Sequence, residues 1–328
     1  MFEWLIDSGV AFTLAVQSWA GGLAEFWQAL SFLGTTEFYL VLLPLIYWCF
    51  DKAFAVRLTF LLLIGSALNV ILKLAWRLPR PFWISADIYA SHFEPTFGAP
   101  SGHSQTPLSL WGLAATTLSR PWFTWLAAAL VALIGFSRIA LGLHFHFDVL
   151  SGWLLGLLAL WAFLRFEKPV TAWLLRLSLA RQVLVALAAS LLLIALGALA
   201  IASAGDFAMP ADWERNSLAV VGSSLDGVFS LSELITPAAT LFGFGAGLAW
   251  LESRGGFRVQ GTIEQKSLRY LLGTAVVLAL WAGLGAVFPR QADLLSYALR
   301  YLRYALIGFW GAGLAPEAFV RLGLARRA

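Results

Sequence analysis

The sequence is poor in cysteine and in charged residues. Its 328 residues include one cysteine, Cys49, which excludes an intrachain disulfide framework and a zinc site built from cysteines. Only 12% of the residues are charged, whereas 60% are hydrophobic and the mean hydropathy is +0.80. This composition lies outside the soluble range and predicts a polytopic membrane protein. The net charge of +4 comes from basic residues scattered at the ends of apolar runs, so we expect membrane lipids and no nucleic acid as partners.

Apolar runs long enough to cross a bilayer occur along most of the chain. A span needs about 17 to 25 residues. The sequence therefore predicts an all-α membrane bundle with nine transmembrane helices. The expected spans are 31–50, 54–75, 104–119, 122–141, 147–165, 182–203, 236–252, 267–288 and 296–319. Residues 1–30 are expected to form an N-terminal interfacial segment, and residues 166–181 an amphipathic linker on the inner surface.

Basic residues are distributed unequally between the two sets of span ends. One side collects 14 of the 22 Lys and Arg residues, and the long loop 204–235 on the other side is acidic. The positive-inside rule makes the first side cytoplasmic. We expect a multi-pass protein of the inner membrane with its N-terminus on the periplasmic or lumenal side and its C-terminus in the cytoplasm. The opening MFEWLIDSG lacks the positive region of a cleavable signal peptide, so insertion is expected to rely on the spans.

The twelve residues from Ser137 to Asp148 place an arginine, two histidines and an aspartate inside this apolar chain. Unless it is paired or faces water, an ionisable side chain in hydrocarbon costs several kcal/mol, so this cluster indicates a function. His144 and Asp148 are four residues apart, and on one helical face the carboxylate would accept a hydrogen bond from the imidazole. The other ring nitrogen would then be free for chemistry. His146 would point to the opposite side and is expected to be structural.

Two further polar segments precede this cluster. Ser101 and Gly102 stand where an apolar helix is expected to begin, so their N–H groups would form an anion site, and His103 could donate a proton to a leaving group. A serine helix cap with a solvated histidine is the alternative. Prolines end the helix after Lys73, so Lys73 and Arg80 could lean over one site. Snorkelling of cations at a membrane edge is the alternative for this pair.

Together the three segments offer cations, a helix N-terminus and two histidines, which suits a phosphoryl group. The cations would neutralise its oxygens, one histidine would attack phosphorus, and the other would protonate the departing oxygen. No acidic cluster suits magnesium and no Cys/His set suits zinc, so no metal and no other cofactor is expected. The candidate site residues are Lys73, Arg80, Ser101, Gly102, His103, Arg138, His144 and Asp148.

These segments resemble the three signature motifs of the type 2 phosphatidic acid phosphatase superfamily, which includes bacterial acid phosphatases and vanadium haloperoxidases. The resemblance implies that His144 is the phosphorylated nucleophile, that Asp148 orients it, and that His103 is the general acid and later activates water. It also implies a phosphate bound without metal by Lys73, Arg80, Ser101, Gly102 and Arg138. The matching patterns are K-x6-R-P from Lys73 to Pro81, P-S-G-H from Pro100 to His103, and S-R-x5-H-x3-D from Ser137 to Asp148.

The resemblance assigns residues 31–165 to a phosphatase core of five to six helices and leaves 182–328 as four additional transmembrane helices. The nine-span layout and the Arg80 to Trp83 tetrapeptide resemble the glucose-6-phosphatase branch, whereas Asp148 is closer to lipid phosphatases. The prediction is an integral-membrane phosphatase for a phosphate or diphosphate monoester of a lipid at the outer face. Phosphatidate, a sphingoid-base phosphate and a polyprenyl diphosphate all fit.

Four alternatives stay open at this point. One is haloperoxidase activity, since vanadate would mimic phosphate in the same pocket. A sugar phosphate hydrolase fits the nine-span layout. A non-catalytic protein that binds or transports lipid phosphates would need the cations but not the set of His103, His144 and Asp148. Transfer of the phosphoryl group to another lipid in place of water would use the same phosphohistidine. The sequence does not determine the oligomeric state or the role of the last four helices.

Overall fold

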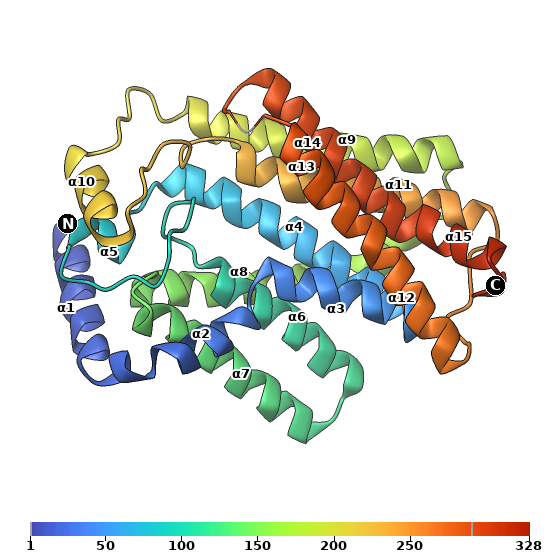
Figure 1. The fold of residues 1–328 in the computed structure, drawn as a ribbon, viewed down its shortest axis with the longest axis horizontal. Coiled ribbons are helices and arrows are strands. Elements are labelled where there is room, and N and C mark those ends of the chain that lie inside the picture. Colours follow the sequence, from blue (N-terminus) through green and yellow to red (C-terminus); the bar gives the residue numbers. More distant parts are fainter. Residues whose placement is uncertain (1, 290) are drawn as a thin grey trace. The chain divides into compact units, whose positions relative to one another are not determined.

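Helices joined by loops make up the chain in the residues that the structure describes (Figure 1). It is a computed structural model that describes residues 2–289 and 291–328. In these residues no strand forms, and the only extended pairing is an isolated bridge between Arg258 and Arg326. The prediction of an all-α protein is confirmed. The α-helices are α1 (Phe2–Ala20), α2 (Ala24–Phe32), α3 (Thr36–Cys49), α4 (Lys52–Trp76), α5 (Pro81–Ile84), α6 (Gly102–Leu118), α7 (Pro121–Ala140), α8 (His146–Leu174), α9 (Leu179–Ala202), α10 (Ala211–Val221), α11 (Ser232–Ser253), α12 (Ile263–Leu278), α13 (Leu284–Val287), α14 (Leu294–Phe309) and α15 (Ala315–Arg321).

Seven helical stretches of the described chain are long and apolar enough to cross a membrane. Each of the nine expected spans lies mostly in helix, but α6 has 17 residues and neither it nor the α14 to α15 stretch is among the seven. The count of nine spans therefore stays a prediction. The seven stretches are Trp4–Cys49, Lys52–Ile84, Pro121–Ala140, His146–Leu174, Leu179–Ala202, Ser232–Ser253 and Ile263–Val287.

Helix ends follow local sequence signals. Arg77, in the left-handed region with φ of 54°, ends α4, and Pro81 then opens α5. Ser119, at φ of 50°, ends α6 just before Pro121 opens α7. Residues 166–174 continue α8 through Pro169, although a separate linker was predicted to begin at residue 166.

The helices group into two compact units, neither of which is contiguous in sequence. The predicted domain boundaries at residues 30, 165 and 181 stay a prediction. The first unit holds residues up to Phe38, Leu68–Ala162 and Gly197–Ser230. The second unit holds Tyr39–Ala67, Phe163–Leu196 and Leu231–Ala328.

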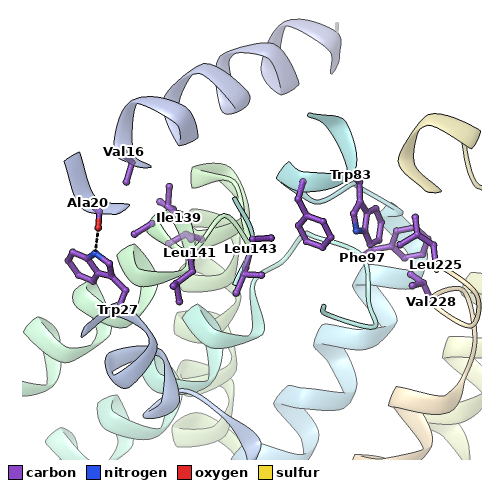
Figure 2. Packing of buried hydrophobic residues seen from close by; sticks show 14 residues of the cluster. Val16, Ala20, Trp27, Trp83, Phe97, Ile139, Leu141, Leu143, Leu225 and Val228 are labelled. Atoms are coloured by element: carbon purple, nitrogen blue, oxygen red, sulfur yellow. Dashed lines mark hydrogen bonds between the residues drawn. The ribbon is translucent and has the colours of Figure 1, made fainter. Parts of the chain in front are cut away.

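Aromatic and aliphatic side chains from distant parts of the sequence form the core of the first unit (Figure 2). In one part of this core Trp83 and Phe97 lie beside Leu225 and Val228, which belong to the long connection between α9 and α11. Phe97 packs its ring 6.0 Å from that of Trp83 and 6.1 Å from that of Phe207. Burial of these side chains fixes the segment around Phe97 without any regular secondary structure.

Close helix packing brings α6 and α8 together within the first unit. A Cβ atom at Gly152 would lie 2.4 Å from the carbonyl oxygen of Ser101, so a larger residue would force the helices apart. One turn later, the Ser109 hydroxyl donates to the carbonyl oxygen of Gly156 at 3.1 Å. Small residues of this kind let helix backbones approach each other in membranes. The contact places the beginning of α8 against the beginning of α6.

The second unit has its own core around Trp48, Phe257 and Phe319, in which α11 packs along α14. Its most buried cation is Arg269 of α12, which is 0% exposed. The Arg269 guanidinium makes five hydrogen bonds of 2.6 to 3.2 Å, all to backbone carbonyl oxygens. The acceptors are Trp48, Val259, Gln260 and Leu324. This arginine holds irregular segments of the chain to α12.

Candidate active site

Lys73 and Arg80 meet at one short segment of the loop that precedes α6. The Lys73 ammonium, in the last turn of α4, donates to Thr96 Oγ1 at 2.9 Å and to the Phe97 carbonyl at 2.8 Å. Arg80 is 0% exposed and donates to the Thr96 carbonyl at 2.7 Å and to Thr96 Oγ1 at 3.0 Å. It also donates to the carbonyl oxygen of Leu143 at 2.8 Å. Both cations therefore bind the same loop segment, and Arg80 joins the first motif to the third.

His144 lies between Arg80 and Asp148. Its Nδ1 is 3.3 Å from Asp148 Oδ2, and its Nε2 is 3.3 Å from Arg80 Nη1. An arginine keeps its protons, so Nε2 acts as the acceptor and Nδ1 carries the ring proton that Asp148 accepts. His144 is 1% exposed and Asp148 is 0% exposed. The result is an imidazole fixed in one tautomer with its Nε2 lone pair on the side of the cations.

The local structure that produces this pair differs from the prediction. His144 does not share a helical face with Asp148, because α8 begins at His146 and His144 belongs to the turn before it. Gly142 makes this turn possible: it has φ of +69°, and a Cβ there would lie 1.9 Å from the carbonyl oxygen of Tyr89. Asp148 Oδ2 also accepts from the backbone N–H of Phe145 at 2.9 Å. The carboxylate thus holds the turn and the imidazole together.

The second motif lies at the N-terminus of α6, with Ser101 at the cap position and Gly102 and His103 in the first turn. The Ser101 N–H donates to the carbonyl oxygen of Asp148 at 2.9 Å, which joins the second motif to the third. His103 is one of the charges that hold down the pKa of Glu94, so it lies within electrostatic reach of that carboxylate. The Ser101 N–H is therefore already paired, whereas the Gly102 N–H in the first turn has no acceptor within the helix and could meet an anion.

Asn69 links the first motif to the second, and the sequence analysis missed it. Its Nδ2 donates to the Pro100 carbonyl at 3.1 Å and to Gln105 Oε1 at 2.8 Å. Asn69 and Gln105 are 5% and 1% exposed. Asn69 stands four residues before Lys73, one helical turn earlier on the same face, and this spacing was the available signal.

Arg138, in the last turn of α7, is 1% exposed and brings in two partners that the sequence did not indicate. Its Nη1 donates to Ser31 Oγ at 2.6 Å, and its Nη2 donates to Glu94 Oε1 in a short ion pair. The second Glu94 oxygen, Oε2, is 3.6 Å from Arg80 Nη2. Glu94 therefore bridges both arginines of the candidate site. Nothing in the sequence spacing points from Glu94 to Arg138, because the two residues are 44 positions apart.

Burial and the charges around them set the ionisation of His144 and Glu94, which lie in connections between helices. Burial lowers the pKa of His144 well below its usual value, and the positive charges of Arg80 and Lys73 lower it further. Burial alone would raise the pKa of Glu94, but Arg138 and Arg80 hold that pKa well below its usual range. Near pH 7 the site therefore contains a neutral imidazole and an ionised carboxylate.

The remaining histidine of the third motif contacts a different part of the unit. The His146 ring lies 5.1 Å from the ring of Phe12 in α1, in an edge-to-face contact. This contact fits the structural role predicted for it. Among the described residues, no group of three or more His, Cys, Asp or Glu side chains could hold a metal ion.

Known protein families match the chain in two places. A model of the PAP2 superfamily matches residues 54–172, which contain all three motifs, and a model of the PAP2 superfamily phosphatase transmembrane extension matches residues 235–327. Phosphatidylglycerophosphatase B of Bacillus subtilis is 31% identical over 176 residues, covering 49% of this chain and 81% of that protein. The chain belongs to the PAP2 superfamily. The predicted family is thus confirmed, and so is a multi-pass membrane protein.

Two other relatives match less of their own length. Lipid phosphate phosphatase delta of Arabidopsis thaliana is 28% identical over 181 residues, which are 50% of this chain and 44% of that protein. Undecaprenyl-diphosphatase of Sulfolobus acidocaldarius is 29% identical over 107 residues, which are 32% of this chain and 51% of that protein. The chain spans about half the length of these two relatives. The crystal structure of a transmembrane PAP2 type phosphatidylglycerolphosphate phosphatase from Bacillus subtilis aligns with a TM-score of 0.43 and 23% identity, covering 50% of this chain and 86% of that one.

Proposed function

We propose that this PAP2 protein is a metal-independent phosphatase of the membrane that hydrolyses phosphate or diphosphate monoesters of a lipid through a phosphohistidine. The observation that carries the proposal is the environment of His144. Its Nδ1 faces Asp148 and its Nε2 faces Arg80, so a neutral nucleophilic nitrogen points to the place where the cations gather. A protein that only binds phosphate has no use for an imidazole oriented in this way.

The first chemical step forms a bond between His144 Nε2 and phosphorus and breaks the ester P–O bond. His103 gives its proton to the departing oxygen, and Asp148 stabilises the positive charge on the His144 ring. Lys73, Arg80, Arg138, the Gly102 N–H and the Ser101 hydroxyl, which is buried without a partner among the described residues, stabilise the phosphoryl oxygens as charge shifts between them.

The second step removes the phosphoryl group from His144. His103, now neutral, takes a proton from a water molecule, the water oxygen attacks phosphorus, and the P–N bond breaks. Inorganic phosphate leaves and both histidines return to their first state. Transfer to a lipid hydroxyl would follow the same path with the alcohol in place of water.

A lipid substrate is supported by the position of the site and by the relatives. Asp148 stands in the first turn of α8, and the next turns of that helix expose Leu150 and Leu154, which are 55% and 59% exposed. A phosphate head group at His144 would therefore lie beside a lipid-facing surface. The three curated relatives carry the names of a lipid phosphate phosphatase, an undecaprenyl-diphosphatase and a phosphatidylglycerophosphatase.

A substrate panel in one detergent preparation tests the proposal. Phosphatidate, phosphatidylglycerophosphate, a sphingoid-base phosphate, a polyprenyl diphosphate and glucose 6-phosphate are compared by release of inorganic phosphate with a chelator present. We expect at least one lipid to be hydrolysed far faster than glucose 6-phosphate. If glucose 6-phosphate alone turned over, the lipid proposal would fail in favour of the sugar phosphate alternative.

We also propose that the site opens on the outer face of the inner membrane, because the basic residues predict that orientation. Asp87, exposed in the loop before α6, provides a test position. With Cys49→Ser in the background, Asp87→Cys should react with a membrane-impermeant thiol reagent in intact cells. Labelling only after the cells are broken would place the site on the cytoplasmic side.

A further inference from the structure

The Glu94 carboxylate holds the same two arginines that the proposed function assigns to the substrate. One oxygen pairs with Arg138 and the other lies 3.6 Å from Arg80. Two oxygens of one anion, each directed at a different guanidinium, are also what a phosphoryl group would offer to these arginines. A carboxylate and a phosphoryl group cannot accept the same N–H protons at once.

The position of Glu94 allows it to leave. It lies in the irregular loop before α6, and its side chain is 16% exposed, whereas those of Arg138 and Arg80 are 1% and 0% exposed. Its remaining partner, His92, is 3.3 Å away and 51% exposed. If the carboxylate turns outward while an anion enters, Arg138 stays paired throughout, so no bare charge is left buried.

The backbone beside Glu94 is held more firmly than its side chain. Thr96 and Phe97 accept hydrogen bonds from Lys73 and Arg80 through backbone carbonyls and the Thr96 hydroxyl. The Phe97 side chain is 0% exposed in the core of the first unit. Rotation of the Glu94 side chain alone would therefore free Arg138 Nη2 and take the negative charge away from Arg80, while Arg80 stays bound to the loop carbonyls and the loop keeps its place.

We infer that Glu94 determines the affinity of the phosphate site: its carboxylate competes with the phosphoryl group for Arg138 and Arg80, and returns to them as inorganic phosphate leaves. This inference rests on the proposed function. It assigns to Glu94 a selectivity for doubly charged anions, since an anion with one charge offers the arginines no more than the carboxylate already does. It also gives the enzyme a means of releasing its product from a site of three cations.

Binding of inorganic phosphate to the purified full-length protein tests the inference. Glu94→Gln keeps the size of the side chain and removes its charge. Because the competing charge is lost close to the anion, we expect phosphate to bind about tenfold more tightly and to inhibit hydrolysis at correspondingly lower concentration. Asp87→Asn removes one charge from an exposed position of the same loop and serves as the matched control, with no change in phosphate affinity expected.

The opposite result has a clear meaning. If Glu94→Gln bound phosphate no more tightly than the wild type, or less tightly, Glu94 would be a positioning residue for Arg138 and the inference would be overturned. Glu94→Asp keeps the charge that Arg138 needs but is too short to bridge both arginines, so we expect a smaller gain in affinity. Should the glutamine variant fail to fold, the aspartate variant decides: unchanged or weaker binding overturns the inference.

The same measurements separate this inference from the proposed function. If the wild type hydrolysed lipid phosphates and the Glu94 variants bound phosphate no better, the inference alone would fail. If no phosphate ester were hydrolysed but the variants bound phosphate more tightly, the phosphatase proposal would fail while the competition at the arginines stood.

Discussion

Two buried arginines, Arg269 of the second unit and Arg138 of the first, are paired differently. In the second unit, the Arg269 guanidinium donates five hydrogen bonds to backbone carbonyls. In the first unit, Arg138 donates to Ser31 and to the carboxylate of Glu94, and its buried Nε has no partner among the described residues. Carbonyl acceptors cannot leave without unfolding the chain, whereas a partly exposed carboxylate can. The carbonyl pairing of Arg269 stabilises the fold, whereas the carboxylate pairing of Arg138 leaves that cation available for an exchangeable anion.

The histidines are also distributed unequally between the two units. All four lie in the first unit, and the second unit contains none. The second unit thus offers cations without a histidine, which supports assigning the phosphohistidine chemistry to the first unit. The following predictions test this difference, from the largest expected effect to the smallest.

The largest effect is expected at His144. His144→Ala should lower phosphate release by about 10⁴-fold or more, because it removes the nucleophile, while the protein remains folded. His146→Ala is the matched control two residues away and should keep most of the activity. Labelled substrate should leave an acid-labile phosphoryl group on the wild type and on the His146 variant. Substantial turnover by His144→Ala would sink the phosphohistidine mechanism.

Arginine substitutions in the two units should have opposite consequences. Arg138→Ala should lower kcat/KM by about 10³-fold, since a charge that stabilises the transition state is lost, with a small change in melting temperature. Arg269→Ala should lower the melting temperature clearly, because it leaves four backbone carbonyls without their donor, while the protein that remains folded keeps its activity. Activity per folded molecule and melting in detergent distinguish the two. Equal losses of activity in both variants would contradict the comparison.

A smaller effect is expected from buried polar bridges between helices. Asn69→Ala removes the bridge from α4 to Pro100 and Gln105, and it should lower kcat/KM by about tenfold as the second motif loses its position. Ser190 is the counterpart in the second unit, where its hydroxyl donates to the Ala238 carbonyl at 2.6 Å. Ser190→Ala should lower stability by about 1 kcal/mol and leave kcat/KM unchanged. Asn69→Gln keeps the amide and should recover part of the lost kcat/KM. If kcat/KM of Asn69→Gln rose only as far as its melting temperature did, Asn69 would have a purely structural role.

The smallest effect is expected in the pH dependence of the folding stability. The pKa of His144 is lowered in the folded protein by burial and by Arg80 and Lys73, whereas in the unfolded chain it should be about 6.5. The unfolded chain therefore takes up a proton first, so stability present above pH 6.5 is lost as the pH falls, by at most about 1.4 kcal/mol per pH unit for one group. Intrinsic tryptophan fluorescence in detergent should show a melting temperature that decreases from pH 7 to pH 5. The melting temperature of His144→Asn should decrease less steeply with falling pH. An identical slope in the variant and the wild type would show that His144 does not contribute to the pH dependence of stability.

Much of the candidate site could be predicted from sequence because its chemistry is local. Ser137 to Asp148 lie within one turn and its flanking helices, and the two earlier motifs each stand at a helix end, where proline, serine and glycine signal the boundary. Their residue types and spacings were enough to indicate a phosphoryl site and its superfamily. The one local error concerns His144, because Gly142 permits a turn that the four-residue spacing alone does not reveal.

Tertiary structure decided which residues complete the site. Glu94 and Arg138 are 44 positions apart, and no periodicity relates them, so only folding brings the carboxylate to the guanidinium. Packing likewise carries Leu225 and Val228, in a connection that the sequence marks merely as acidic, into the core beside Phe97. The sequence by itself determined a helical membrane protein with a cationic histidine site, because composition and short spacings govern those features. Only the three-dimensional packing decided which anion of the chain faces that site, because burial and long-range ion pairing depend on the whole fold.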